Sequence, residues 1–274
     1  MISSISNILG YLLNYIYLFI NNYGVAIIIF SILIKIVLLP LSVKQQKTMK
    51  KSAKLQIKVK EMQDKYKNNP EKLNQEMMDL YKRENMNPFS GCLSSIVQII
   101  LLFAVFYLVR SPLTYMKKVE PTVIENYKAE ISTSSAYPEV QIIREKGAED
   151  EKVYINMEFL GLDLSSIPNV NYKDYKVYII PVLYVLSSII SMKLTTNMQN
   201  VKSEKKENEE SNKNEEYDAM QSMNKSMSYM MPIMAVSISL VAPLGLALYW
   251  LVNNILMIVE RIVLNKFLKE EEEA

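Results

Sequence analysis

Lys35 lies inside an otherwise apolar run, YGVAIIIFSILIKIVLLPL, at residues 23–41. An ammonium group in a bilayer core costs on the order of 3 kcal/mol on insertion scales, so such a residue normally faces protein or water. Its side chain could extend to the membrane surface, because the inner end of its span is about six residues, or roughly 9 Å, away. Alternatively, it could offer a positive charge to a ligand carboxylate inside a polar cavity.

Four apolar segments carry polar residues at helical spacing. In the first, Ser31 and Ser42 form a row with Lys35. A single row of small polar side chains is typical of helix–helix contacts in membranes, whereas four rows and one charge favour a polar cavity shared between the helices. The rows in the other segments are Ser95 with Gln98; Tyr184, Ser187, Ser188, Ser191 and Thr195; and Trp250, Asn253 and Met257. The candidate substrate-binding residues are Lys35, Ser31, Gln98, Ser188, Ser191, Trp250 and Asn253.

Residue types needed for most enzymatic chemistry are missing or isolated. The chain has no histidine, and its one cysteine is Cys92, which excludes an internal disulfide and argues against a zinc site. It contains no G-x-S-x-G motif and no P-loop. The run 227–259 carries no charge, and we expect the spans to hold no Asp, Glu or His, which argues against intramembrane proteolysis. We therefore predict that the protein is not an enzyme and has no catalytic residue, metal or cofactor.

Hydropathy predicts five membrane spans that position these residues. A hydrocarbon core of about 30 Å needs about 20 apolar residues, and the run 227–259 would be roughly 50 Å long as one helix. VAPLG at 241–245 is therefore interpreted as a turn between two spans. The predicted spans are 24–42, 91–109, 177–196, 227–242 and 244–264.

The predicted fold class is an all-α integral membrane protein. One domain covers residues 1–267, and an acidic tail follows at 268–274. Residues 1–22 have apolar side chains every three or four positions, which predicts an amphipathic helix lying on the membrane surface and not crossing it.

Loop charges predict the orientation, because basic loops stay on the cytosolic side. Residues 44–87 hold twelve basic and six acidic side chains, whereas residues 111–176 hold eight basic and eleven acidic. The first loop is therefore predicted to be cytosolic and the second outside, with the N-terminus outside and the C-terminus cytosolic. Alternation of the spans alone places the loop 198–226 in the cytosol.

The loop 44–87 is predicted to form a hairpin of two amphipathic helices. KNNP at 67–70 interrupts the helical pattern, with Asn69 as the N-cap and Pro70 as the first residue of the second helix. The apolar residues on the facing sides of the two helices are Leu55, Val59, Met62 and Tyr66 in the first and Leu73, Met77, Leu80 and Tyr81 in the second.

This order of features resembles the YidC/Oxa/Alb family of membrane protein insertases, in its short bacterial form. The resemblance covers most of residues 20–267 and implies five spans, an outside N-terminal helix and a cytosolic hairpin. The matching stretches are NYGVAIIIFSILIKIVLLPLSVKQQKTMKK, KYKNNPEKLNQEMMDLYKRENMNPFSGCL, FLGLDLSS, MMPIM and PLGLALYWLVNN.

The resemblance also implies a function. Family members carry a positive residue, most often arginine, in the first span, where it faces a water-filled groove; Lys35 occupies that position here. The implied activity is to insert and help fold newly made membrane proteins in the bacterial plasma membrane, without nucleotide hydrolysis. The implied partners are nascent membrane protein clients and lipids, with the Sec translocon, the ribosome and the signal recognition machinery as further candidates. No direct nucleic-acid site is evident.

The sequence departs from the family pattern at three places. Lysine replaces arginine at position 35, which keeps the charge and loses the bidentate fork. Ser94 stands where many relatives have proline, and the tail LKEEEEA is acidic where some relatives have a long basic tail.

Two other functions compete with insertion. A docking or assembly scaffold without insertion activity would keep the hairpin and would not need Lys35. A transporter would usually need internal repeats or intramembrane carboxylates, and neither is found in the sequence. Depletion of the protein followed by a survey of mislocalised membrane proteins separates a scaffold from an insertase.

Overall fold

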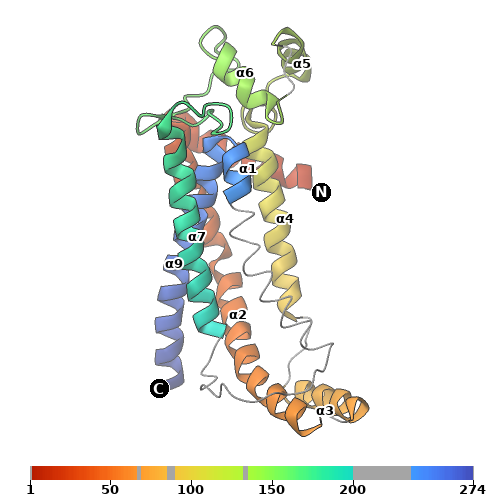
Figure 1. Cartoon of the computed structure of the whole chain (residues 1–274). Coiled ribbons are helices and arrows are strands. Elements are labelled where there is room, and N and C mark those ends of the chain that lie inside the picture. Colours follow the sequence, from red (N-terminus) through yellow and green to blue (C-terminus); the bar gives the residue numbers. More distant parts are fainter. Residues whose placement is uncertain (1, 67–68, 85–89, 132–134, 200–235, 274) are drawn as a thin grey trace.

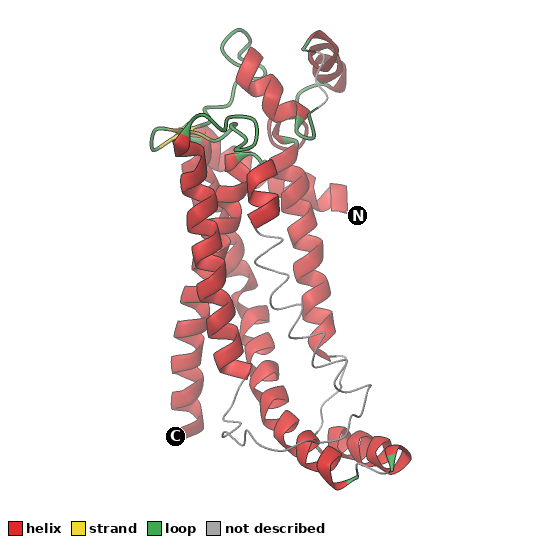
Figure 2. Ribbon diagram, in the orientation of Figure 1, coloured by secondary structure: helices red, strands yellow, loops and turns green. Residues whose placement is uncertain are grey.

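The computed structural model describes residues 2–66, 69–84, 90–131, 135–199 and 236–273. Most of these residues are helical, and the regular strands among them are two residues long (Figure 2). The long helices are α1 (Ile2–Ile20), α2 (Tyr23–Lys65), α3 (Pro70–Arg83), α4 (Ser90–Arg110), α5 (Pro121–Glu130), α6 (Pro138–Lys146), α7 (Ile179–Gln199) and α9 (Leu244–Glu273). The short elements are η1 (Leu113–Lys117), β1 (Glu158–Phe159), β2 (Leu162–Asp163) and η2 (Tyr175–Tyr178).

Four helical segments in the described residues are long and apolar enough to cross a membrane. They are Ile2–Ile20, Tyr23–Thr48, Tyr175–Leu194 and Leu244–Phe267, and Val97–Arg110 is a shorter apolar helix. The prediction of an all-α membrane protein is therefore confirmed in this general form. The count of five spans stays a prediction, because most of the expected span 227–242 and of the loop 198–226 lies outside the described residues.

Helices α2, α4, α7 and α9 run side by side along the long axis of the molecule (Figure 1). Helix α2 packs against the other three, and α7 packs against α9. Helix α3 lies at one end of this bundle, and α5 and α6 lie at the other end. The polar side chains predicted to share a cavity therefore come from helices that are in contact.

Helix α1 meets the length and composition criteria for a span, yet it lies across the end of the bundle near α5 and α6 (Figure 1). One face packs against α2, α4 and η1, and the residues buried there include Gly10 and Leu13. The opposite face leaves large apolar side chains exposed, as a lipid-facing surface would. These are Ile8, Tyr11, Tyr15, Leu18 and Phe19.

Helix α2 joins two elements that the sequence analysis separated. It begins after Asn22, whose side chain accepts a hydrogen bond from the amide of Val25, and it runs without a break to Lys65. The predicted span 24–42 and the first helix of the predicted hairpin are therefore one continuous helix. Pro40 lies inside the helix, and α2 continues past it although a proline cannot donate the backbone hydrogen bond at its position.

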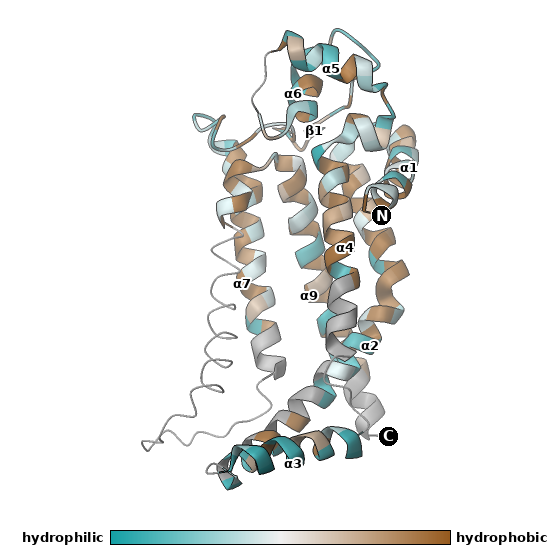
Figure 3. Ribbon diagram, turned by 90° about the vertical axis from the view of Figure 1, so that its right-hand side faces the viewer, coloured by the Kyte–Doolittle hydropathy of each residue, from teal (hydrophilic) through white to brown (hydrophobic). Residues whose placement is uncertain are grey.

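The end of α2 and helix α3 pack together through a small apolar cluster. Leu55, Val59 and Leu80 are buried in it, and Met62, Met77 and Tyr81 surround them. Asn69 accepts a hydrogen bond from the amide of Lys72, so the predicted N-cap is confirmed. Figure 3 shows that α3 is largely hydrophilic, unlike the apolar upper parts of α2 and α4.

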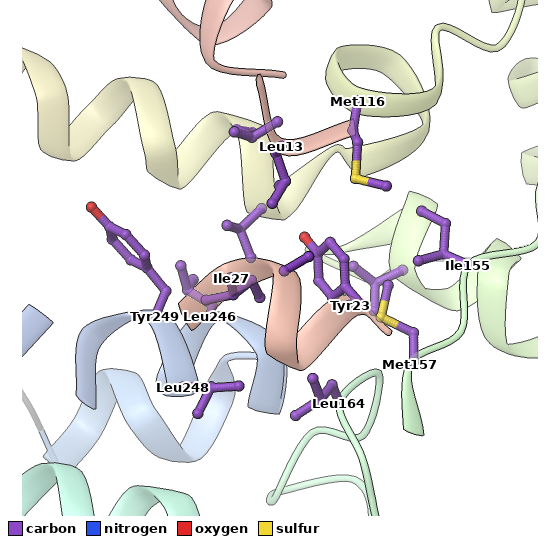
Figure 4. Packing of buried hydrophobic residues seen from close by; sticks show 14 of the residues in the cluster. Leu13, Tyr23, Ile27, Met116, Ile155, Met157, Leu164, Leu246, Leu248 and Tyr249 are labelled. Atoms are coloured by element: carbon purple, nitrogen blue, oxygen red, sulfur yellow. The ribbon is translucent and has the colours of Figure 1, made fainter. Parts of the chain in front are cut away.

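The described part of residues 111–178 forms a folded layer over the end of the bundle, where the sequence predicted an outside loop at 111–176. Its apolar side chains join those of the span ends in one core, where Met116, Ile155 and Met157 surround Tyr23 of α2 (Figure 4). A Cβ atom at Gly24 would lie 2.4 Å from the ring of Phe159, so only glycine allows β1 to approach α2 this closely.

The same layer fixes the start of α9. The backbone amides of Leu244 and Gly245 donate to the carbonyls of Ser166 and Leu164, both at 2.9 Å. The first amides of a helix have no partner within the helix, so the layer satisfies them here. The helical stretch 236–241 ends just before this point, where VAPLG predicted a turn.

Glu139 is a buried carboxylate within this layer. It is 4% exposed and accepts hydrogen bonds from the amide and the hydroxyl of Thr114, at 2.9 and 2.6 Å. Burial raises the pKa of Glu139 above its usual value, and the hydrogen bonds from Thr114 oppose that shift only in part. The native state therefore binds a proton at Glu139 more readily than the unfolded state does.

Stability of this layer is expected to depend on pH through Glu139. Because the folded pKa is raised, the contribution is complete below the unfolded pKa of about 4.5 and is lost as the pH rises through the folded pKa. Hydrogen exchange of α6 and η1 should thus slow as the pH falls toward 4.5, after correction for the intrinsic exchange rate. Glu139→Gln should flatten this dependence, whereas Glu145→Gln, on an exposed side chain of the same helix, should not. An unchanged profile in Glu139→Gln would assign the effect to another group.

Candidate functional site

Lys35 forms an ion pair with Glu260 of α9. The Nζ and Oε2 atoms are 2.6 Å apart, and the two side chains are only 19% and 11% exposed. The expectation of a lone cation among spans without acidic residues is therefore wrong. The charge-free run ends at Val259, but the predicted span 244–264 already contains Glu260, and α9 carries this residue within the apolar segment Leu244–Phe267.

Glu260 could have been found from the sequence. The predicted polar row Trp250, Asn253 and Met257 continues at the same spacing to Glu260 and Arg261. Residues three or four positions apart lie on one face of a helix. The row therefore extends to Glu260 and Arg261, two charges inside the predicted span 244–264.

Arg261 connects the three helices beside this ion pair. Its guanidinium donates to the carbonyl oxygen of Ser191 on α7 at 3.2 Å, and the Ser191 hydroxyl lies 3.5 Å away. The side chain of Gln46 on α2 donates to the carbonyl of Arg261 at 3.4 Å. Ser191 is therefore part of the contact between α7 and α9, the role that a single polar row typically has. Its predicted part in substrate binding stays a prediction.

Asn254 forms a second polar contact between α7 and α9. Its amide donates to the hydroxyl of Ser188 at 2.7 Å and lies 3.4 Å from that of Ser187. Two aromatic rings pack nearby, with the centroids of Tyr184 and Trp250 5.8 Å apart. Asn254 was missed because its neighbour Asn253 fitted the predicted row; Asn253 instead donates to the carbonyl of Tyr249 in its own helix.

These side chains form one group, which we call the interhelical polar cluster. It joins α2, α7 and α9, which pack against one another. Its members are Lys35, Gln46, Ser187, Ser188, Ser191, Asn254, Glu260 and Arg261.

Four predicted residues are not members of this cluster: Trp250 and Asn253, described above, and Ser31 and Gln98. Ser31 is buried, and its hydroxyl donates to the carbonyl of Ile27 in the same helix, at 2.8 Å. Gln98 is exposed on α4. No hydrogen bond between described residues joins either side chain to the interhelical polar cluster. Ser31 satisfies its hydroxyl within α2 because apolar neighbours surround it there.

The charges of the interhelical polar cluster do not cancel. Lys35 and Arg261 carry two positive charges, and Glu260 carries one negative charge. Oε1 of Glu260 is buried and has no hydrogen-bond partner among the described residues. A buried carboxylate oxygen without a partner is unfavourable, so a group that offers a donor or a cation could bind there. The arrangement suits electrostatic recognition and has no feature of a nucleophilic site.

Comparison with known proteins gives one family match and many similar sequences. Residues 15–272 match the family described as 60Kd inner membrane protein. A protein of Chlorobium phaeovibrioides named membrane protein insertase YidC is 55% identical over 93 residues, which is 34% of this chain and 16% of that protein. A protein of the same name from Caldanaerobacter subterraneus is 42% identical over 109 residues, 40% of this chain and 53% of that protein. The matched segments thus cover from about a sixth to about half of these relatives.

Proposed function

The chain belongs to the 60Kd inner membrane protein family, and from this premise we propose that it is an insertase for newly made membrane proteins. It is a multi-pass protein of the cell membrane. The observation that carries the proposal is the ammonium group of Lys35, held among three packed apolar helices beside the interhelical polar cluster. A positive charge there gives a client's acidic tail a place to stop on its way through the membrane.

The proposed orientation follows from charge and from exposed apolar surface. The basic hairpin of α2 and α3 lies in the cytosol, and the layer of residues 111–178 lies outside. The exposed apolar face of α1 then lies in the outer leaflet, which explains why these large side chains are not covered by protein. The N-terminus is outside and the C-terminus is cytosolic.

Insertion proceeds through a polar groove between the helices in three energetic steps. A client carboxylate within about 4 Å of Lys35 gains up to roughly 4 kcal/mol at an effective dielectric near 20, before its own desolvation. A membrane potential negative inside then favours outward movement of each acidic residue by about 2.3 kcal/mol per 100 mV. Burial of the client's span in lipid completes the transfer at about 25 cal/mol per Å². These contributions require no nucleotide.

Reconstitution tests this proposal directly. The purified protein is placed in liposomes, and a single-span client is added from the medium, with a potential that makes the lumen positive and with no ATP or GTP. We expect protease-protected client only in liposomes that contain the protein. Two results contradict the proposal. One is failure to insert any client. The other is insertion that appears only after nucleotide is added, with no other protein present.

The hairpin is proposed to receive the client before it enters the bilayer. Deletion of residues 55–80 removes the cluster of Leu55, Val59 and Leu80 and leaves the apolar segment Tyr23–Thr48 intact. We expect a membrane-inserted protein whose insertion activity falls at least about tenfold, equivalent to roughly 1.4 kcal/mol. The measurement is the insertion rate at equal amounts of reconstituted protein. Full activity of the deletion would leave the hairpin with no role beyond fixing the topology.

A further inference from the structure

Glu260 pairs with the positive charge of Lys35, which a client carboxylate is proposed to bind. It is a carboxylate on Nζ of Lys35, at 2.6 Å, so it offers the same chemistry as an acidic residue in a client tail. We propose that Glu260 competes with client carboxylates for Lys35 and thereby sets how acidic a tail the protein accepts. This inference rests on the proposed function and assigns Glu260 as a specificity-determining residue within it.

The geometry favours exchange of one carboxylate for another. Lys35 keeps 19% of its side chain exposed, so the pair is not fully enclosed by protein. Glu260 bonds Lys35 through one oxygen, while Oε1 is buried with no partner among the described residues. A half-satisfied carboxylate is held less firmly than a fully hydrogen-bonded one. Lys35 stays paired before and after the exchange, whereas the displaced Glu260 carboxylate loses its ammonium partner. Glu260 therefore opposes the exchange, and only a client tail that binds Lys35 well enough to offset that loss displaces it.

The neighbouring cations do not take over the role of Lys35. Arg261 donates to the backbone of Ser191 on α7, and Lys193 is exposed on α7. With Glu260 in place, an approaching carboxylate meets a neutral pair at Lys35, whose attraction falls faster with distance than that of a free cation. Tails with several carboxylates therefore compete with Glu260 better than tails with one.

The experiment compares two clients in the reconstituted system. They are identical single-span proteins, except that three acidic residues in the outside tail of one are amides in the other. The measured quantity is the ratio of the insertion rates, acidic tail over amide tail. In Glu260→Gln this ratio should rise at least about threefold over the wild type, which corresponds to roughly 0.7 kcal/mol.

A matched control removes a carboxylate from a surface pair. Glu125 pairs with Lys128 on α5, in the layer of residues 111–178, and its side chain is 69% exposed. Glu125→Gln should therefore leave the ratio of rates unchanged. A rise in both variants would mean that overall charge, and not competition at Lys35, controls the ratio.

A chemical measurement on the wild type keeps the proposal testable if Glu260→Gln does not fold. A water-soluble carbodiimide joins Nζ of Lys35 to the carboxyl carbon of Glu260 as an amide and takes up the released water as a urea. Increasing amounts of an acidic tail peptide should reduce this internal cross-link and produce a peptide adduct on Lys35, whereas the amide-substituted peptide should not.

The outcomes separate the two proposals. An unchanged or lower ratio in a folded Glu260→Gln protein, or an internal cross-link that the acidic peptide does not reduce, overturns the competition. Failure of the wild type to insert either client contradicts the proposed function instead, and the cross-linking experiment still decides whether acidic peptides displace Glu260.

Discussion

Lys35→Ala is expected to lower the free energy of unfolding by about 3 kcal/mol, the lower end of the range for breaking a buried ion pair from one side. The substitution leaves the Glu260 carboxylate, 11% exposed, without the ammonium that neutralises it. It also leaves both carboxylate oxygens without a described hydrogen-bond partner, because Oε1 already has none. The measurement is thermal unfolding of the purified protein in detergent, followed by loss of helical circular dichroism.

A double substitution distinguishes loss of the pair from loss of the lysine itself. Lys35→Ala with Glu260→Gln removes both charges, so it should recover most of the stability that Lys35→Ala loses. Lys193→Ala serves as the matched control, because Lys193 is an exposed lysine on α7. The prediction fails if Lys35→Ala is no less stable than Lys193→Ala, or if the double variant is as unstable as the single one.

Because Lys35 is paired with Glu260, a Lys35 substitution can change insertion in two ways: through stability and through attraction of the client. Lys35→Arg keeps the charge and should support insertion, whereas Lys35→Glu faces Glu260 with a second negative charge and should insert clients with acidic tails poorly. A defect in Lys35→Ala alone combines lost stability with lost client attraction. Insertion by the double variant isolates the second effect, because its fold carries no unpaired carboxylate.

Hydropathy and helix-end signals predicted the parts of the fold that depend on local sequence. The apolar runs around Lys35 and after Leu244 became α2 and α9, and Asn69 with Pro70 marked the start of α3. These features were accessible because a helix and its cap are determined within one or two turns. Ser188 and Ser191 were predicted for the same reason, since each lies in a row on one face of α7.

Long-range contacts were not predictable in this way. The layer of residues 111–178 lacks a strong periodic pattern, and its structure depends on partners distant in the sequence. The contact of Gly24 with Phe159 and the hydrogen bond from Asn169 to Leu240 are examples. Glu260 was missed for a different reason: it lies inside the predicted span 244–264, but the spans were expected to hold no acidic residue, and a carboxylate with a partner on the next helix violates that expectation.

The second large effect is expected at Gly10 of α1. A Cβ atom there would lie 1.9 Å from the carbonyl oxygen of Tyr115 and 2.6 Å from its carbonyl carbon. The obstruction is backbone of η1, which cannot turn aside as a flexible side chain can. Gly10→Ala must therefore move α1 away from η1, although alanine itself favours a helix more than glycine does.

Separation of α1 from η1 should cost about 3 kcal/mol, the upper part of the range for overpacked sites, because the displaced atoms are backbone. It would also disturb Ser6, whose hydroxyl donates to the carbonyl of Ala104 in α4 at 2.9 Å. Hydrogen exchange of α1 and η1 in detergent should accelerate in Gly10→Ala. Ser4→Ala, at an exposed position of the same helix, is the matched control and should exchange like the wild type.

Insertion activity of Gly10→Ala links this contact to the proposed function. Helix α1 and the core around Tyr23 share the same buried cluster, which also contains Leu246 and Leu248 of α9. A shift of α1 should therefore reach the helices that hold Lys35 and Glu260 and reduce insertion of every client, acidic or not. A fall confined to clients with acidic tails would instead place the effect at the ion pair. Normal exchange of α1 and η1 in Gly10→Ala would show that α1 is not packed against Tyr115 as described.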